Sequence, residues 1–211
     1  MSDDWSDMTL REFQTALASS SPTPGGGTAA AVALGQAAAL TCMVCDLTLG
    51  KERYQEGWDV AEKAIGIAVP LLSRSLDLAK EDSSSFDLVM GSYRMSKETE
   101  QEASIRLAAI QEATLGAAEV PYETAELALK LLQSLPELAR KGNPNAVSDV
   151  GVAALLASAA CKGALFNVEI NLTSLPDEFG AEMRSNIPTI QESVRKVSRE
   201  AMDAVRDRLS D

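Results

Sequence analysis

The sequence predicts an all-α fold: an antiparallel up-and-down helical bundle, built as a single domain over residues 1–211. Only 4% of the residues are aromatic while alanine is abundant, which favours closely packed helices over a β-sandwich. No segment alternates β-branched and polar residues as a half-buried strand does. Two long segments of small, mostly uncharged residues complete the pattern, and we expect them to form two central helices lying side by side.

A short helix and a loop are expected before the first central helix. Thr9 and Glu12 match a capping box, which predicts a helix that ends near Ser19. Residues 21–28 contain two prolines and three glycines, which disfavour a helix, so we expect a loop. This loop leads into the first central helix, expected over residues 28–49.

The loop is a candidate binding site because its backbone N–H groups precede the positive end of a helix dipole. Both features favour an anionic or polar ligand. The candidate contacts are Pro24, Gly25, Gly26 and Gly27.

Prolines divide the middle of the chain. A third helix is expected over residues 57–93, bent or divided at Pro70 because proline has no backbone N–H to donate. Pro121 is expected to separate two further helices, over residues 98–118 and 121–139.

The second central helix is expected over residues 146–172, after a Gly-Asn-Pro-Asn turn. A turn over residues 174–177 then leads to an amphipathic helix that reaches Leu209 and is broken or kinked near Pro188.

Charge and hydropathy restrict the partners. The net charge of −12 argues against nucleic acid or an anionic membrane. The first five residues do not begin a basic segment followed by an apolar one, so no signal peptide and a cytoplasmic location are expected. The uncharged run from Thr28 to Cys45 is only marginally long enough to span a membrane, and its Gly35, Gln36 and Thr41 favour a buried core helix.

The absence of histidine limits the chemistry. It removes Ser-His-Asp and Cys-His catalysis and histidine-dependent metal sites, so acid–base catalysis falls to Asp, Glu, Lys, Tyr or Cys. Cys42, Cys45 and Cys161 are too few for a four-ligand zinc site and are expected to be buried reduced thiols. We expect no metal and no cofactor.

Four polar candidates flank the ends of the central helices. Lys51 and Tyr54 follow the first one, where a cation is also explained by the ordinary charge preference of a helix C-terminus. Ser148 and Asp149 begin the second one, where capping of the helix is the default explanation.

Three further candidates lie within helices. Asp82 is in the third helix, where a carboxylate is usually solvated. Asn167 and Asn171 are four residues apart and therefore share one face of the second central helix. Buried hydrogen bonding explains these two amides as readily as contact with a ligand.

The motifs together resemble the formiminotetrahydrofolate cyclodeaminase and methenyltetrahydrofolate cyclohydrolase family, most clearly from about Thr9 to Asp177. These motifs occur along the chain in the order expected for the family. They are residues 21–28, Met43-Val44, residues 47–51, Asp82 with Phe86, residues 142–149 and residues 167–172. The resemblance implies an all-helical homodimer that binds a tetrahydrofolate derivative near the subunit interface, without the fused transferase domain of the animal enzyme. The chain departs from some members by having Lys80 where they carry an acid, so a two-carboxylate mechanism would need Glu81.

The resemblance implies one of two folate reactions by carboxylate acid–base catalysis, and of these we expect hydrolysis of 5,10-methenyltetrahydrofolate to 10-formyltetrahydrofolate. Asp82 would be the acid/base, Asp149 would orient the pterin or stabilise its cation, and Lys51 would attract the glutamate tail. The asparagines, the loop residues, Tyr54 and Ser148 would bind the substrate.

Two alternatives stay open. One is a cyclodeaminase that forms 5,10-methenyltetrahydrofolate with loss of ammonia. The other is a non-catalytic folate-binding protein. We favour the cyclohydrolase because no fused transferase is present to supply a formimino substrate. A bundle without any ligand would leave the loop and the paired asparagines without a purpose.

Overall fold

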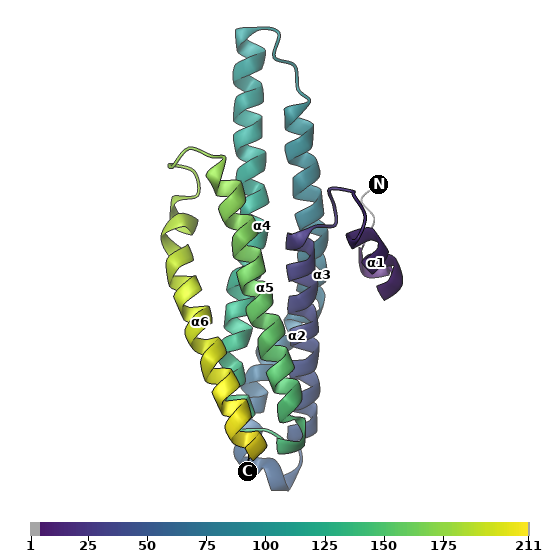
Figure 1. The fold of residues 1–211 in the computed structure, drawn as a ribbon, viewed down its shortest axis with the longest axis vertical. Helices are drawn as coiled ribbons and strands as arrows, with labels where there is room; N and C mark the ends of the chain where they lie inside the picture. The colour runs from purple at the N-terminus through teal and green to yellow at the C-terminus, as the bar shows by residue number, and fades with distance from the viewer. Residues whose placement is uncertain (1–4, 211) are drawn as a thin grey trace.

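The computed structural model describes residues 5–210 and forms an antiparallel bundle of long helices (Figure 1). The elements are η1 (Trp5–Asp7), α1 (Leu10–Leu17), α2 (Gly26–Thr48), η2 (Glu52–Gly57), α3 (Trp58–Tyr93), α4 (Glu100–Lys141), η3 (Pro144–Ala146), α5 (Val147–Thr173) and α6 (Ala181–Ser210). No strand occurs among these residues. Helices α2 to α6 alternate in direction, while α1 stands at the side of the bundle. The predicted all-α, up-and-down fold is confirmed.

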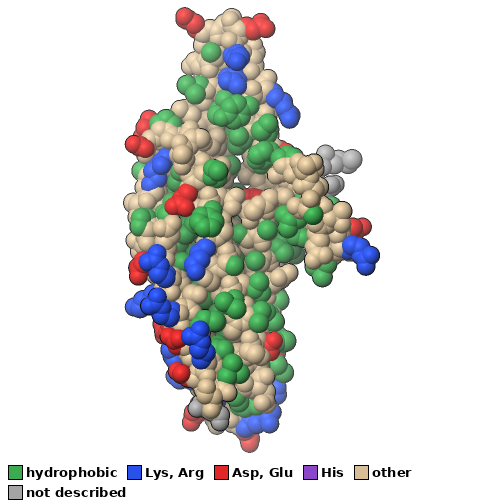
Figure 2. Space-filling view, viewed as in Figure 1, with side chains coloured by type: hydrophobic (Ala, Val, Ile, Leu, Met, Phe, Trp, Pro, Cys, Tyr) green, Lys and Arg blue, Asp and Glu red, His purple; other side chains and the backbone are tan. Residues whose placement is uncertain are grey.

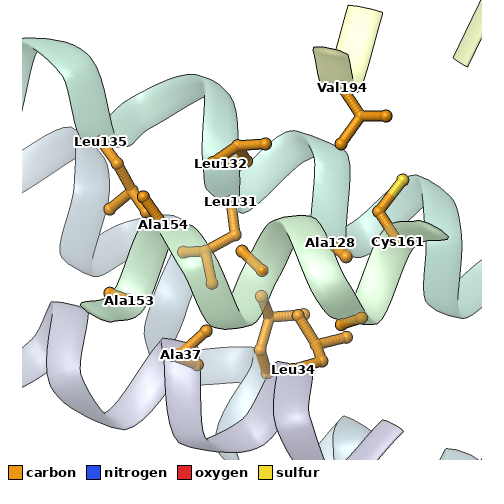
Figure 3. Close-up of a cluster of buried hydrophobic side chains, with 14 of the residues drawn as sticks. Leu34, Ala37, Ala128, Leu131, Leu132, Leu135, Ala153, Ala154, Cys161 and Val194 are labelled. Atoms are coloured by element: carbon orange, nitrogen blue, oxygen red, sulfur yellow. The ribbon is translucent and has the colours of Figure 1, made fainter. Parts of the chain in front are cut away.

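The two small-residue helices α2 and α5 lie side by side, as predicted, and share the core with α4 (Figure 3). Leu34 of α2 and Leu131 of α4 are fully buried in one cluster with the small Ala153 of α5, and Ala37 of α2 lies between Leu34 and Ala153. Alanine at such positions lets helix backbones approach closely, so the leucines of α4 fill the remaining space. Helix α3 covers α2, and α6 covers α4 and α5.

Helix α2 and the segment Pro144–Thr173 are long and apolar enough to cross a membrane. About half of each apolar window, 50% and 56%, is buried inside the bundle, and the core helix of a soluble protein passes the same test. The expectation that no membrane is bound therefore stays a prediction. The N-terminal segment behind the signal-peptide expectation includes residues 1–4, which lie outside the described part of the chain.

The predicted break before Pro121 is wrong, because α4 is one helix of 42 residues. A proline inside a helix leaves the carbonyl four residues earlier without its N–H donor. For Pro121 that carbonyl belongs to Ala117, and the side chain of Asn171 on α5 donates to it at 2.8 Å. A neighbouring helix thus supplies the missing hydrogen bond. Helices α3 and α6 also continue through Pro70 and Pro188, both of which are exposed to solvent.

Two helix starts differ from the predicted ones. Helix α2 begins at Gly26, so the last two glycines of the predicted loop form its first turn. Helix α5 begins at Val147, so Ser148 is its second residue and does not cap it. The predicted capping box of α1 is confirmed: Thr9 N donates to Glu12 Oε2 at 2.8 Å, and Glu12 N donates to Thr9 Oγ1 at 3.3 Å.

The hairpin of α3 and α4 extends beyond the other helices (Figure 1). The start of α2 and the end of α5 meet beside the base of this hairpin. In Figure 2 apolar side chains gather over this region and along α2 and α5, whereas charged side chains concentrate over α6. The antiparallel order therefore brings segments from four helices to one end of the bundle.

Candidate active site

A cavity of about 380 Å³ opens where α2 begins. This volume lies in the range of small-molecule sites. Its walls come from the segment before α2, from α3 and α4, and from the last turns of α5. The lining residues are Pro22, Thr23, Gly25, Gly26, Gly27, Asp82, Ser85, Phe86, Val89, Ala117, Asn167, Ile170 and Asn171.

Asp82 is the one charged side chain among these lining residues. Its Oδ2 accepts a hydrogen bond from Thr28 Oγ1 at 2.8 Å. Burial raises the pKa of Asp82, and hydrogen bonds from the side chain and backbone of Thr28 oppose part of this rise. The carboxylate therefore lies at the positive end of α2, partly withdrawn from water, as suits a group that exchanges protons.

Gly27 explains how the carboxylate comes so close to α2. A Cβ at this position would overlap Asp82 Oδ1 and would lie 2.7 Å from Asp82 Cγ. Only a residue without a side chain leaves room for Asp82 there. The glycines of this segment thus serve close packing as well as offering N–H groups.

The two predicted asparagines line the same cavity. Asn167 Nδ2 donates to Gly163 O at 2.9 Å, and Asn171 Nδ2 donates to Ala117 O at 2.8 Å. Both amide nitrogens therefore bond to backbone carbonyls, and each Oδ1 is the atom that can accept from a ligand. The two explanations that the sequence leaves open, buried hydrogen bonding and ligand contact, apply to the same residues.

Four of the residues proposed from the sequence lie at the opposite end of the bundle from the cavity. Helix α2 has 23 residues, so its ends are about 35 Å apart. Lys51 and Tyr54 follow the far end of α2, and Ser148 and Asp149 begin α5 there. Within one chain they cannot reach the cavity. Lys51 Nζ instead donates to Leu47 O at 2.9 Å, which agrees with the ordinary preference for a cation at a helix C-terminus.

Two nearby residues also differ from expectation. Pro24 is buried and does not line the cavity, whereas the adjacent Pro22 and Thr23 do. Glu81 accepts hydrogen bonds from Arg74 Nη1 at 2.6 Å and Nη2 at 3.0 Å and does not line the cavity either. It therefore does not provide a second carboxylate beside Asp82.

The cysteines are free, as predicted, and Cys45 and Cys161 are buried while Cys42 is half-buried. Burial raises the pKa of Cys45 and of Cys161 to about 12, so these thiols stay protonated at neutral pH.

The formiminotransferase-cyclodeaminase family model matches residues 9–189. The chain belongs to this family. It is 41% identical over 180 residues to a methenyltetrahydrofolate cyclohydrolase of Methylorubrum extorquens, covering 83% of this chain and 85% of that protein. It is 33% identical over 194 residues to the formimidoyltransferase-cyclodeaminase of Gallus gallus, covering 90% of this chain but only 35% of the longer protein. The fold matches the crystal structure of formiminotetrahydrofolate cyclodeaminase from Thermotoga maritima with a TM-score of 0.84 and 29% identity, covering 96% of this chain and 98% of that one.

For this member of the formiminotransferase-cyclodeaminase family, the structure adds cavity residues that the sequence did not assign to the site, although Phe86 stands beside Asp82 in one of the family motifs. Ser85, Phe86 and Val89 follow Asp82 at spacings of three, four and seven, which places them on its helix face and could have identified them. Thr28 could have been found as the first hydroxyl after the glycines. Ile170 lies three residues after Asn167 and could have been found in the same way, whereas nothing in the sequence points to Ala117 as a lining residue.

Proposed function

We propose that the chain hydrolyses 5,10-methenyltetrahydrofolate to 10-formyltetrahydrofolate. The observation that carries the proposal is the single carboxylate, Asp82, in a cavity that also presents the first turn of α2 and two amides. The similarity to a cyclohydrolase over most of both chains supports the choice of reaction. The folate derivative is the expected ligand because the relatives are named for folate reactions.

Asp82 would move the protons of this reaction. It accepts a proton from water as the water oxygen bonds to the carbon that bridges N5 and N10. It returns this proton to N5 as the carbon–N5 bond breaks, and the remaining hydroxyl proton passes to solvent as the formyl carbonyl forms. Acid–base catalysis of this kind contributes about 10²–10⁴-fold to a rate.

The other cavity residues would bind and orient the substrate. The negative charge of Asp82 would stabilise the delocalised methenyl cation. The Oδ1 atoms of Asn167 and Asn171 would accept hydrogen bonds from N–H groups of the pterin, and the half-buried ring of Phe86 would contact its flat face.

The methenyl absorbance tests the proposal directly. Purified protein is mixed with 5,10-methenyltetrahydrofolate and, separately, with formiminotetrahydrofolate, each against a control without enzyme. Faster loss of absorbance from the first substrate with little gain from the second is the expected result. Gain from the second with release of ammonia would make the chain a cyclodeaminase. No change in absorbance relative to the control with either substrate would favour a non-catalytic folate-binding protein.

We further propose that the chain forms a homodimer through the exposed faces of α2 and α5. Leu155 and Phe166 of α5 are 55% and 69% exposed, and Met43 and Leu47 of α2 are also exposed. Single exposed apolar residues are common on protein surfaces, but these residues lie along two helices that pack side by side. A second copy of the same apolar face is a self-complementary partner.

An antiparallel dimer would also account for the distant candidates. Pairing α2 with the antiparallel α2 of a second copy would bring the far end of one protomer to the cavity of the other. Lys51, Tyr54, Ser148 and Asp149 would then contribute to the site across the interface, near which the resemblance places the bound folate.

A further inference from the structure

Three side chains form a continuous hydrogen-bonded row behind Asp82. Trp5 Nε1 of η1 donates to Ser83 Oγ of α3 at 3.0 Å. Ser83 Oγ lies 3.2 Å from Thr28 Oγ1 of α2, and Thr28 Oγ1 donates to Asp82 Oδ2 at 2.8 Å. The row connects the N-terminal segment of the described chain to the carboxylate in the cavity.

The chemistry of the two end groups sets the direction of the row. An indole N–H can only donate, so Ser83 Oγ must accept from Trp5 and has its own proton left for Thr28. An ionised carboxylate can only accept, so the proton of Thr28 points to Asp82. Ser83 is 4% exposed and Thr28 is fully buried, so water does not readily replace either partner. Every donor in the row therefore points toward the carboxylate.

We propose that Trp5 is a positioning residue that holds the carboxylate of Asp82 in its ionised, oriented form through Ser83 and Thr28. The inference rests on the proposed function, in which Asp82 is the acid/base. Donation to the charged form favours ionisation, and a hydrogen bond to a charged acceptor is stronger than one to a neutral acceptor. The row thereby opposes the effect of burial, which raises the pKa of Asp82.

Several charged groups on the surrounding elements pair with residues other than Asp82. Glu81 on the same helix pairs with Arg74, which also pairs with Glu123 of α4. Glu169 of α5 accepts from Gln191 of α6 at 3.1 Å, and Glu12 of α1 is held in its capping box. Helix α2 carries no charged residue before Asp46. The hydroxyl row therefore supports Asp82 from inside the protein, together with the backbone hydrogen bond from Thr28.

The ring of Trp5 also has a packing role that a test must separate from its N–H. It contacts Phe13 edge-to-face, with ring centroids 6.5 Å apart. Trp5→Phe keeps an aromatic ring at this position and removes the N–H. Trp58→Phe is the matched control, because Trp58 Nε1 is buried without a hydrogen-bond partner in the described structure.

The pKa of Asp82 is measured by ¹³C NMR of carboxyl-labelled aspartate in the full chain, with Asp82→Asn assigning the resonance. We expect Trp5→Phe to raise the pKa of Asp82 by about 0.5 and Thr28→Val to raise it further, while Trp58→Phe and Thr28→Ser leave it near the wild-type value. The acid limb of the kcat/KM profile should move to higher pH by the same amount. Ser83→Ala should match Trp5→Phe, and the double variant should shift no further, because both changes interrupt one row.

Each outcome decides the inference. An unchanged pKa in Trp5→Phe, or additive shifts in the double variant, would overturn it, even if Thr28→Val shifts the pKa. If Trp5→Phe does not fold, Ser83→Ala carries the test. Normal turnover by Asp82→Asn would remove the proposed acid/base role, but the NMR titration would still report whether the row acts on the carboxylate.

Discussion

At the residue scale, the partly buried carboxylate of Asp82 is the group proposed to transfer protons. Replacing Asp82 by Asn keeps the shape and an acceptor for Thr28 but removes the group that exchanges protons. We expect turnover to fall by at least about 100-fold while the helical circular dichroism spectrum is retained. Near-normal activity would show that Asp82 is not the acid/base.

Asp82→Asn should also show that the charged form of Asp82 lowers the free energy of unfolding. Its pKa is higher in the folded chain than its ordinary value because burial disfavours the charge. Its contribution to stability is therefore fully present below the unfolded pKa and is lost as the pH rises through the folded pKa. Since Asn does not titrate, the wild type should lose stability relative to Asp82→Asn between acid and neutral pH. Thermal unfolding of both proteins across this range measures the difference, and a constant difference would contradict the prediction.

Gly27 provides a steric test of the same group. A Cβ at Gly27 overlaps the carboxylate, so Gly27→Ala must displace Asp82. Because a misplacement of about 1 Å can cost about 100-fold in rate, we expect kcat/KM to fall by at least about tenfold. Gly66→Ala in α3 is the control, since a Cβ there has no neighbour within 4 Å. Equal activity of the two variants would show that Asp82 has room to move.

At the element scale, Asn171 and Pro121 act as a pair across α5 and α4. Asn171→Ala leaves Ala117 O without its donor and should lower the free energy of unfolding by about 1–3 kcal/mol. Pro121→Ala restores a backbone N–H to that carbonyl, so in this background Asn171→Ala should cost much less. A double-mutant cycle in urea measures the coupling energy, and a value near zero would contradict the pairing.

Local sequence signals predicted most of the elements but not the length of α4. The capping box of α1 and the runs of small residues in α2 and α5 depend only on residues close together in the sequence. The helices that they predict are confirmed. From its neighbours in the sequence, Pro121 predicts a helix boundary. The side chain that replaces its missing N–H donor is Asn171, 50 residues later in the chain. For the cavity, the glycine segment, Asp82 and the asparagines could be chosen from sequence, and the length of the first central helix already separates Lys51 from the loop. The packing adds that α5 begins beside the end of α2, which places Asp149 away from the cavity as well.

At the scale of the whole molecule, the proposed dimer can be tested by its assembly. Leu155→Glu would place a charge on the exposed apolar face of α5, which would have to be buried in the dimer. We expect the wild type to sediment as a dimer and the variant as a monomer. Leu209→Glu is the control, because Leu209 is 63% exposed near the end of α6, away from this face. A monomeric wild type, or a dimeric Leu155→Glu, would contradict the proposed interface.

Complementation between subunits tests whether the far end of one protomer completes the cavity of the other. Asp82→Asn and Lys51→Ala should each be impaired alone, because each removes one part of every site. In a mixed dimer one site would contain both substitutions and the other would contain neither. Random exchange makes half of the dimers mixed, so the mixture should recover about a quarter of the wild-type activity. Activity is measured after unfolding and refolding the two variants together, with each variant refolded alone as the control. If both residues served one protomer, every site would stay defective and no activity would return.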